Sequence, residues 1–310
     1  MREYNDAEWN DRLREIGNKA GFHTPLGTSH RAIFAERGPV LLVSFELRAD
    51  IRTRRHDQIP LGYSVAQGEG VSSLTLIADE VSWFRTPEVF AFFDRLVDEG
   101  FYDDFERVIF FGEGSCGYAA AAFSVTAPGC TVIALQPQAT LDPRLAGWDT
   151  RFRDMRRIDF TSRYGFAPEM IEGAETAFIL FDPDLPFDAM HAALFYRTHV
   201  TLLPCRHLGE PATAVLAEMG ILEPILADAC AGRFDALAFW RHYRTRRNLP
   251  RYLRALSARL EEAQRPLLNA LLCRNVAERL NAPRFRARLT QLEQKLQEFG
   301  TVLPPSRPRA

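Results

Sequence analysis

The chain has 310 residues, of which 46% are hydrophobic and 25% charged, and its formal net charge is -2. This composition is typical of a globular protein and excludes a disordered chain, and the small net charge gives no general attraction to nucleic acid. The sequence begins with a charged segment and contains no apolar run of 18 residues. We therefore expect a cytoplasmic protein without a secretory signal or a membrane span.

Cysteines and histidines are spread along the chain. The five cysteines include no Cys-x-x-Cys pair, and no two histidines form a His-x-His or His-x-x-x-His pair. Zinc sites commonly use such close pairs of ligands. We therefore expect buried thiols and no metal site.

Short apolar runs begin at residue 39 and alternate with longer segments of helical period. Their hydrophobicity is continuous, which predicts strands covered on both faces, as in a parallel sheet. An antiparallel edge strand is expected at 31–38, which leaves residues 1–22 as a peripheral helix. The predicted strands are 39–46, 72–79, 107–114, 131–138, 176–183 and 200–207.

Helices are predicted between these strands, at 86–100, 117–129 and 187–197. The first has Thr86 as N-cap, Pro87 in its first turn and Gly100 as its stop. Alternating strands and helices indicate a doubly wound α/β fold with a mainly parallel sheet.

The pattern changes after His207. From about 212 to 299 the apolar residues recur at helical spacing, which predicts three to five helices. We divide the chain into an α/β domain at 1–210, a helical region at 211–300 and a tail at 301–310. Seven arginines between Arg241 and Arg259 indicate either a basic face for a phosphate or acidic partner, or a solvated surface.

Three predicted strands end in candidate catalytic residues, and ligands of α/β sheets bind at these carboxyl ends. Ser115 lies at the end of the third strand, Asp182 at the end of the fifth and His207 at the end of the sixth. Nucleophile, acid and histidine in this order match the α/β-hydrolase triad. In that arrangement His207 takes the proton of the nucleophile and Asp182 orients the imidazole, with Asp184 as the alternative acid. The ordinary alternative is that Asp182 begins a turn and His207 is a solvated loop residue.

The segment FFGEGSCGYAAAAF (110–123) resembles the nucleophile elbow of α/β-hydrolase-fold proteins associated with polysaccharide biosynthesis, whose motif is Gly-x-Ser-x-Gly-Gly-Tyr-x-Ala. The resemblance continues in QPQATLDPRLAGWDTRF (136–152) and FDPDLPFDAMHA (181–192) and covers about residues 25–210. It implies a sheet of the α/β-hydrolase type and an association with polysaccharide biosynthesis.

Two registers of this elbow are open. Matching Gly117-Tyr118 to the Gly-Tyr of the motif places Gly114 at the apex, where the nucleophile belongs. Glycine tolerates the positive φ of this turn, so the turn can persist without its chemistry. The other register places Ser115 at the apex and Glu113 where the motif has its first glycine, which strains the packing.

Cys116 is a third candidate nucleophile. The start of a helix lowers the pKa of a thiol and so increases its reactivity. The alternative is that Cys116 is a small buried residue that stands in for a glycine between helix and sheet.

Other side chains near the same edge suit a ligand. An oxyanion hole needs backbone N–H groups after the nucleophile and near Phe45, at the end of the first predicted strand. Gln138 and Trp148 follow the fourth strand and offer an amide and an aromatic ring to sugar hydroxyls. The loop 47–71 is rich in arginine and faces either an anionic ligand or solvent.

The glycine spacing Gly112-x-Gly114-x-x-Gly117 also fits a dinucleotide-binding turn. It lies on the third predicted strand, however, and no acid for a ribose follows at 134–138. Lys19 and Lys295 are the only lysines, so no lysine-containing phosphate loop is present. We expect no cofactor.

Two functions remain open. The favoured hypothesis is a catalytically degenerate α/β-hydrolase-fold protein that binds a glycan, a lipid or, through its helical C-terminal region, a protein partner. The alternative is a serine hydrolase, an esterase or deacylase for glycan esters, that uses Ser115, His207 and Asp182. Neither hypothesis involves nucleic acid.

Overall fold

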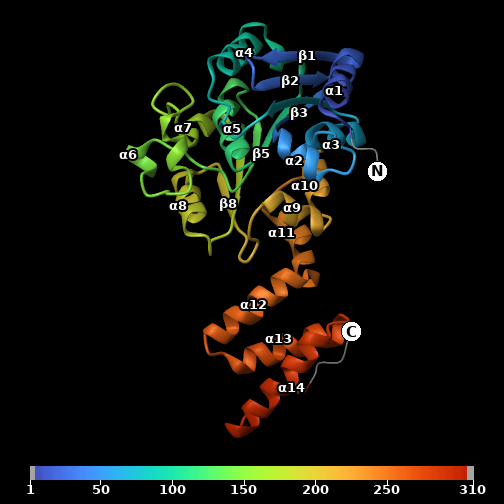
Figure 1. The fold of residues 1–310 in the computed structure, drawn as a ribbon, viewed down its shortest axis with the longest axis vertical. Coiled ribbons are helices and arrows are strands. Elements are labelled where there is room, and N and C mark those ends of the chain that lie inside the picture. Colours follow the sequence, from blue (N-terminus) through green and yellow to red (C-terminus); the bar gives the residue numbers. More distant parts are fainter. Residues whose placement is uncertain (1–3, 306–310) are drawn as a thin grey trace. The chain divides into compact units, whose positions relative to one another are not determined.

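The structure of the protein is a computed structural model that describes residues 4–305. The chain forms two compact units, Met1–His242 and Tyr243–Ala310. The first unit contains an eight-stranded sheet with helices on both faces (Figure 1). This arrangement, followed by helices alone, confirms the predicted fold class.

The sheet has the strand order β1-β2-β4-β3-β5-β6-β7-β8. Strand β2 is antiparallel to both of its neighbours, and the six strands from β4 to β8 in this order pair in parallel. These six correspond to the six predicted strands. The strands are β1 (Gly21–Leu26), β2 (His30–Ala35), β3 (Val40–Leu47), β4 (Ser72–Ala78), β5 (Arg107–Glu113), β6 (Thr131–Leu135), β7 (Thr176–Phe181) and β8 (Val200–Pro204).

The edge of the sheet differs from the prediction. The strand expected at 31–38 is β2, but β2 is not the edge strand, because β1 pairs with its outer side. Gly27, at φ 66°, lies in the turn between the two strands. Strand β1 contains Pro25 and has partly exposed side chains, so it lacked the continuous apolar run by which the other strands were found.

Ten α-helices of the described chain precede residue 231. Helices α4, α5 and α8 confirm the three predicted ones, whereas α2 and α3 lie in the predicted loop 47–71. These two are short and rich in polar residues, yet α2 buries Ile51 and α3 buries Leu61 and Val65. The helices are α1 (Asp6–Ala20), α2 (Arg48–Arg54), α3 (Leu61–Glu69), α4 (Pro87–Asp98), α5 (Ser115–Phe123), α6 (Pro143–Ala146), α7 (Ala167–Met170), α8 (Pro186–Leu194), α9 (Ala212–Glu218) and α10 (Leu222–Cys230).

The main hydrophobic core lies around α5, whose nine residues are all buried. Phe123 from this helix stacks on Phe93 of α4, with ring centroids 4.3 Å apart. On the other face of the sheet, Trp9 of α1 packs with Ile33 and Ile77. The two clusters use alternate residues of β2 and β4, as expected for a sheet covered on both sides.

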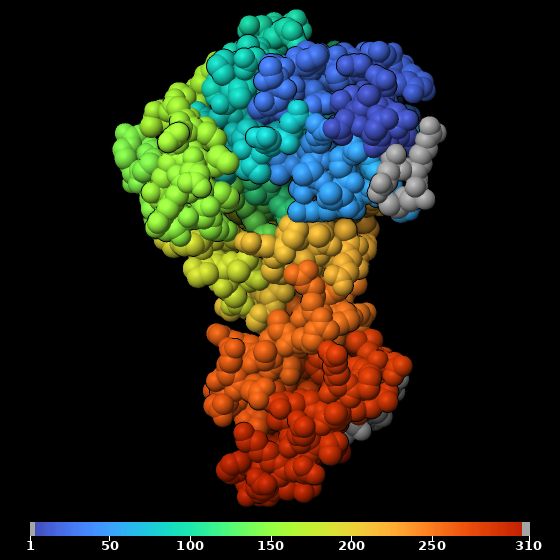
Figure 2. Space-filling view, in the orientation of Figure 1, coloured from blue at the N-terminus to red at the C-terminus, as the bar shows by residue number. Residues whose placement is uncertain are grey.

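Helices α9 and α10 belong to the first unit, where α10 packs on α3 and on the strands β3 and β5. Figure 2 shows this unit hollowed where light-blue atoms near residue 50, green atoms near residue 150 and yellow-orange atoms near residue 210 meet. The hollow therefore lies at the carboxyl ends of the strands, where the candidate catalytic residues were expected.

Helix α11 (Ala236–Tyr243) ends at the boundary between the units, and the second unit contains α12 (Pro250–Glu262), α13 (Pro266–Arg279) and α14 (Pro283–Glu298). α13 and α14 pack through Ala270, Cys273, Leu292 and Leu296. Six α-helices follow β8 in the described chain, rather than three to five. The division of the chain into domains at residue 210 stays a prediction. The boundary between the two compact units falls between His242 and Tyr243 along the chain.

The two ends of the chain were also predicted. Helix α1 lies within the expected peripheral helix at 1–22, and residues 301–305 of the expected tail have no helix or strand. Residues 1–3 and 306–310 lie outside the described residues. No helix within residues 4–305 is long and apolar enough to cross a membrane.

Candidate functional site

The turn from β5 to α5, residues Gly112–Gly117, is called the elbow below. Gly114 links strand and helix at φ 58° and ψ -120°, a conformation that residues with side chains rarely adopt. Its N–H donates to the Leu135 carbonyl at 2.8 Å, and its carbonyl accepts from the Tyr118 N–H at 2.9 Å. The positive φ of the turn thus falls on Gly114, and Ser115 is the first residue of α5.

The glycines beside the apex hold strand and helix close together. A Cβ atom on Gly112 would lie 2.2 Å from the Cys116 carbonyl oxygen, and one on Gly117 would lie 3.1 Å from the Gly112 carbonyl oxygen. A Cβ atom on Gly114, in contrast, would meet no heavy atom within 4 Å. The elbow therefore needs glycine at 112 for space, while position 114 is open and needs glycine only for its backbone conformation.

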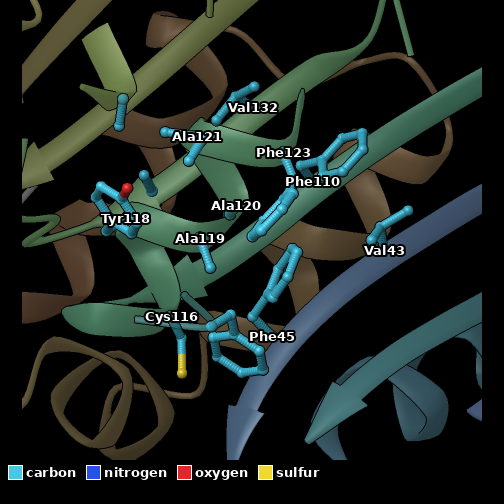
Figure 3. Packing of buried hydrophobic residues seen from close by; sticks show 14 of the residues in the cluster. Val43, Phe45, Phe110, Cys116, Tyr118, Ala119, Ala120, Ala121, Phe123 and Val132 are labelled. Atoms are coloured by element: carbon cyan, nitrogen blue, oxygen red, sulfur yellow. The ribbon is translucent and has the colours of Figure 1, made fainter. Parts of the chain in front are cut away.

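Ser115 and Cys116 begin α5 and are both nearly buried. Figure 3 shows Cys116 beside Phe45, at the end of the packed face of α5. Burial raises the pKa of the Cys116 thiol well above its usual value, and the nearby carboxylates of Asp50, Glu46 and Glu113 raise it further. The thiol is therefore neutral at physiological pH, which disfavours a nucleophilic role.

We expect Cys116 to react slowly with alkylating agents, because the neutral thiol is a poor nucleophile and 4% of the residue is exposed. In the native protein, iodoacetamide should modify Cys116 no faster than Cys230, another buried cysteine whose pKa burial raises to about 12. Peptide mass spectrometry over a time course measures both rates. Alkylation of Cys116 tenfold faster than Cys230 would contradict this expectation.

Two cavities adjoin the elbow. The elbow cavity, of about 410 Å³, has Gly114 and Ser115 in its wall and is otherwise lined by Leu47, Asp50, Arg54, Val81, Glu113, Gln136, Gln138, Arg151, Phe152, Asp188, Glu210 and Pro211. The inner cavity, of about 230 Å³, has a lining that includes Phe45, Phe111, Cys116 and Leu222. Leu47, Asp50, Arg54 and Glu113 line both, so the two cavities share a wall.

Carboxylates and amides at the strand ends hold the helices that surround these cavities. Glu113, at the end of β5, accepts hydrogen bonds from the N–H (3.0 Å) and the hydroxyl of Thr213. Gln136, just after β6, accepts one from the Ala212 N–H at 3.0 Å. Both bonds cap the first turn of α9. Glu46, at the end of β3, accepts the Leu61 and Gly62 N–H groups of α3, each at 2.8 Å.

Replacing Glu113 with glutamine should change how stability depends on pH. Burial raises the folded-state pKa of Glu113, although hydrogen bonds from Thr213 oppose the shift. The folded chain therefore binds the proton of the Glu113 carboxyl more tightly than the unfolded chain does. Protonation of Glu113 thus favours the folded state, and this contribution to stability is lost as the pH rises from the pKa of the unfolded chain through the pKa of the folded chain.

Glutamine carries no such proton, so the free energy of unfolding of Glu113→Gln relative to the natural chain should rise from about pH 4 to pH 7. Urea unfolding at both pH values measures this difference. A difference that stays constant, or that falls with pH, would contradict the role assigned to burial.

The candidate acids Asp182 and Asp184 lie in the loop after β7, and the candidate histidine His207 lies in the loop after β8. The Asp182 carboxylate accepts backbone N–H groups from Asp184 (3.0 Å), His207 (3.2 Å) and Gly209 (2.9 Å), so it fixes the two loops to each other. The His207 Nδ1 atom lies 3.1 Å from Oδ2 of Asp184, the alternative acid. Within residues 4–305, none of Asp182, Asp184 and His207 is among the residues that line the elbow cavity.

A buried polar network that the sequence did not reveal lies beside the elbow cavity. Nε2 of His191 lies 3.1 Å from Asp149, and Nδ1 accepts the Ala139 N–H at 3.1 Å. Arg151 contacts Asp149 at 2.9 Å and Asp188 at 2.6 Å. No spacing signal in the sequence joins residues 149, 151, 188 and 191.

The charge states of this network follow from burial and pairing. Burial lowers the pKa of His191 more than Asp149 raises it, so the imidazole is neutral and its Nε2–H donates to Asp149. Burial acts to raise the pKa of Asp149, but hydrogen bonds from His191 and Arg151 outweigh it and lower that pKa well below its usual value. Asp149 is therefore an ionised carboxylate in the protein interior.

The three predicted ligand-binding residues lie in three different places in the structure. Phe45 lines the inner cavity and Gln138 the elbow cavity. The Gln138 Oε1 atom accepts the indole N–H of Trp83 at 3.0 Å. Trp148 instead packs on Phe187, with ring centroids 6.2 Å apart, and lines neither cavity.

The arginines of the predicted loop 47–71 contact different parts of the first unit. Arg48 and Arg52 pair with Asp6 at 2.6 and 3.1 Å and lie over the Trp9 ring, so they fix α1. Arg54, paired with Asp50 at 2.9 Å, lines both cavities. Across the described chain, 4–305, no group of three or more His, Cys, Asp or Glu side chains is arranged to hold a metal ion.

Comparison with known proteins gives matches at the level of structure only. No family model matches the sequence, and no curated protein matches it. Solved structures that resemble it include a thermophilic carboxylesterase cloned from a metagenomic library, with 12% sequence identity and a TM-score of 0.43. The matched region covers 74% of this chain and 96% of the carboxylesterase chain.

Two further structures are similar at the same level. The capsule O-acetyltransferase of Neisseria meningitidis serogroup A is 11% identical, with a TM-score of 0.43 and coverage of 69% of this chain and 99% of its own. A glycosylation-associated protein complex from Streptococcus agalactiae is 13% identical, with a TM-score of 0.42 and coverage of 69% of this chain and 47% of its own. Similarity of this degree carries no information about activity.

The fold follows from the topology of the chain itself. The sheet is mainly parallel, its second strand is antiparallel, and its fifth strand passes through a sharp glycine-containing turn into a buried helix. A strand, a strained turn and a helix in this place are the elbow of α/β-hydrolases. The first unit thus has a doubly wound sheet of the α/β-hydrolase type, and an all-helical region follows it.

Proposed function

We propose that this chain is a catalytically degenerate α/β-hydrolase-fold protein that binds a glycan in its elbow cavity without hydrolysing it. The observation that carries the proposal is the glycine at the strained position: Gly114 has φ 58° and ψ -120° and no side chain that could attack a carbonyl. In an active α/β-hydrolase the nucleophile projects from this position of the turn.

The surrounding residues support the same proposal. Ser115 lies one residue later, in the first turn of α5, and both oxygens of Asp182 accept backbone N–H groups. A working triad needs the hydroxyl, the imidazole and the acid in one hydrogen-bonded line. Glu113, where the elbow motif has an unspecified residue, is used to cap α9.

The chemistry of the elbow cavity fits a polyhydroxylated ligand. Its lining includes the polar residues Gln138, Arg54, Arg151 and Ser115. These donors and acceptors match sugar hydroxyls, and a volume of about 410 Å³ lies in the range of small-molecule sites. A part in polysaccharide biosynthesis, which the sequence resemblance implied, belongs to the same proposal, and so does a cytoplasmic location.

Binding is tested with defined sugars. In saturation-transfer NMR with N-acetylglucosamine, cellobiose and maltotriose, at least one sugar should receive saturation from the natural chain. Val81→Trp, which fills the cavity from a position that is 39% exposed, should abolish the signal. Val97→Trp is the matched control, because Val97 is 48% exposed and does not line this cavity. No transfer to any sugar, or equal transfer in Val81→Trp, would contradict glycan binding at this site.

Serine hydrolysis is the second candidate function. Its support is that Ser115 lines the elbow cavity and that an acid, Asp184, contacts the His207 ring. Hydrolysis of p-nitrophenyl acetate separates the two functions. The degenerate site should give the same rate in the natural chain and in Ser115→Ala, whereas a loss of tenfold or more in the variant supports the hydrolase.

A further inference from the structure

Charge is distributed very unevenly between the two units. Residues 243–310 contain fifteen Arg or Lys and five Asp or Glu, an excess of ten positive charges. The whole chain has a net charge of -2, so residues 1–242 carry an excess of twelve negative charges. A helical unit of this charge attracts an acidic partner over distances of about 8–10 Å at physiological salt.

The same unit contains a groove that α12 and α14 border, with a volume of about 530 Å³. Leu253 and Val276, both buried, and Leu280 and Phe285, both half-buried, give it an apolar floor. This volume lies in the range of roughly 300–1,000 Å³ that is typical of binding pockets. The groove therefore offers apolar contact in the middle of a basic surface.

Arginines form the rim of the groove. Arg254 on α12 and Arg284 on α14 are exposed, and within the described residues neither has a carboxylate within ion-pair distance. Arg288 contacts Glu261, the one acid in the lining. Two exposed guanidinium groups on opposite helices thus flank an apolar floor.

From this combination we propose that the groove binds an acidic amphipathic helix of a partner protein. The apolar side chains of such a helix fill the floor, and its carboxylates pair with Arg254 and Arg284. This is the helix-in-groove mode of recognition, with anchors one and two turns apart. The proposal is independent of the glycan site and concerns the second unit alone.

Other occupants fit the groove less well. A nucleic acid presents phosphates and sugars to a basic surface and leaves the apolar floor without a contact. A membrane surface is flat, whereas this site is concave. In a second copy of the chain, the amphipathic helix α4 already buries its apolar residues Val89, Phe92, Phe93 and Leu96 in the main core.

A designed peptide tests the proposal directly. The probe is a fluorescein-labelled peptide of about 18 residues, with leucines at i, i+3, i+4 and i+7 and glutamates at the outer positions. Fluorescence anisotropy with the full chain at physiological salt should give a micromolar Kd. A peptide of the same charge with serine in place of leucine should bind at least tenfold more weakly.

Variants locate the site. Arg254→Glu with Arg284→Glu should weaken binding at least tenfold, and so should Ala258→Trp, which fills the groove without changing charge. Arg259→Glu with Arg265→Glu is the matched control, because both arginines are exposed and neither lines this groove. The control should change the Kd by less than twofold. Circular dichroism must show the same helix content in all variants.

Four results would overturn the proposal. Equal loss in both arginine pairs would mean attraction by charge alone, and unchanged binding in Ala258→Trp would place the peptide elsewhere. Tighter binding to oligouridylate or to phosphatidylglycerol vesicles than to the peptide would identify nucleic acid or membrane as the occupant. A dimer in sedimentation velocity that Arg254→Glu with Arg284→Glu dissociates would identify a second copy.

Discussion

Asp149→Ala should destabilise the protein by about 3–5 kcal/mol, because it leaves the buried Nε2–H of His191 without its acceptor and removes a carboxylate that pairs with Arg151. The Asp149 side chain is fully buried and contacts both His191 and Arg151. In the variant the His191 Nε2–H loses its acceptor, and Arg151 keeps only Asp188 and, at 3.4 Å, Glu210. Urea unfolding at neutral pH measures the loss.

Asp94→Ala is the matched control for this prediction. Asp94 also pairs with an arginine, Arg163, at 2.7 Å, but both side chains are more than a third exposed. Exposed pairs of this kind contribute at most about 1 kcal/mol. Equal losses in the two variants would show that the buried network does not stabilise the fold.

The effect of Asp149→Ala should also depend on pH. Pairing with His191 and Arg151 lowers the folded-state pKa of Asp149 below its unfolded value, despite the opposing effect of burial. The stability that this carboxylate supplies is therefore present above the unfolded pKa, at about 3.9, and is lost as pH falls through the folded pKa. The difference between natural chain and variant should shrink on acidification below about pH 4.

Gly112→Ala should cost about 3 kcal/mol, because it forces two backbones apart. The new Cβ atom would lie 2.2 Å from the Cys116 carbonyl oxygen and 2.8 Å from the Gly117 nitrogen, and neither atom belongs to a flexible side chain. The strand β5 and the helix α5 must separate to admit it. Since α5 lies at the centre of the main core, the shift also disturbs the packing around it.

Gly68→Ala is the control for a glycine without close neighbours. A Cβ atom there would meet nothing within 4 Å, and Gly68 lies inside α3. Alanine favours helix over glycine by about 1 kcal/mol, so this variant should be unchanged or slightly more stable. Thermal unfolding compares the two, and a Gly112→Ala variant as stable as the natural chain would contradict the close approach at the elbow.

The parallel core of the fold could be predicted from sequence because its strands are covered on both faces. Continuous apolar runs such as 131–138 leave few alternatives to a buried strand. Strand β1 and helices α2 and α3 could not be found in this way. Each has one side on the surface, so polar residues interrupt its apolar pattern. In β1, Pro25 interrupts the pattern as well.

The candidate site was predictable in position but not in its contacts. Chain order placed Ser115, Asp182 and His207 after the ends of three strands, as the sheet requires. Which acid contacts His207 depends on the turn after β7, where Asp182 is engaged by backbone N–H groups and Asp184 reaches the ring. The network of Asp149, Arg151, Asp188 and His191 joins distant segments through tertiary packing and has no pattern in the sequence.

The measurement that tests the degenerate elbow most directly is labelling with a fluorophosphonate, which reacts covalently with the activated serine of a hydrolase. The natural chain and Ser115→Ala should both remain unlabelled after hours with excess probe, while an active serine esterase in the same tube is labelled. Intact-protein mass spectrometry reports the adduct. Stoichiometric labelling of the natural chain that disappears in Ser115→Ala would show that Ser115 is an activated nucleophile and that the site is catalytic.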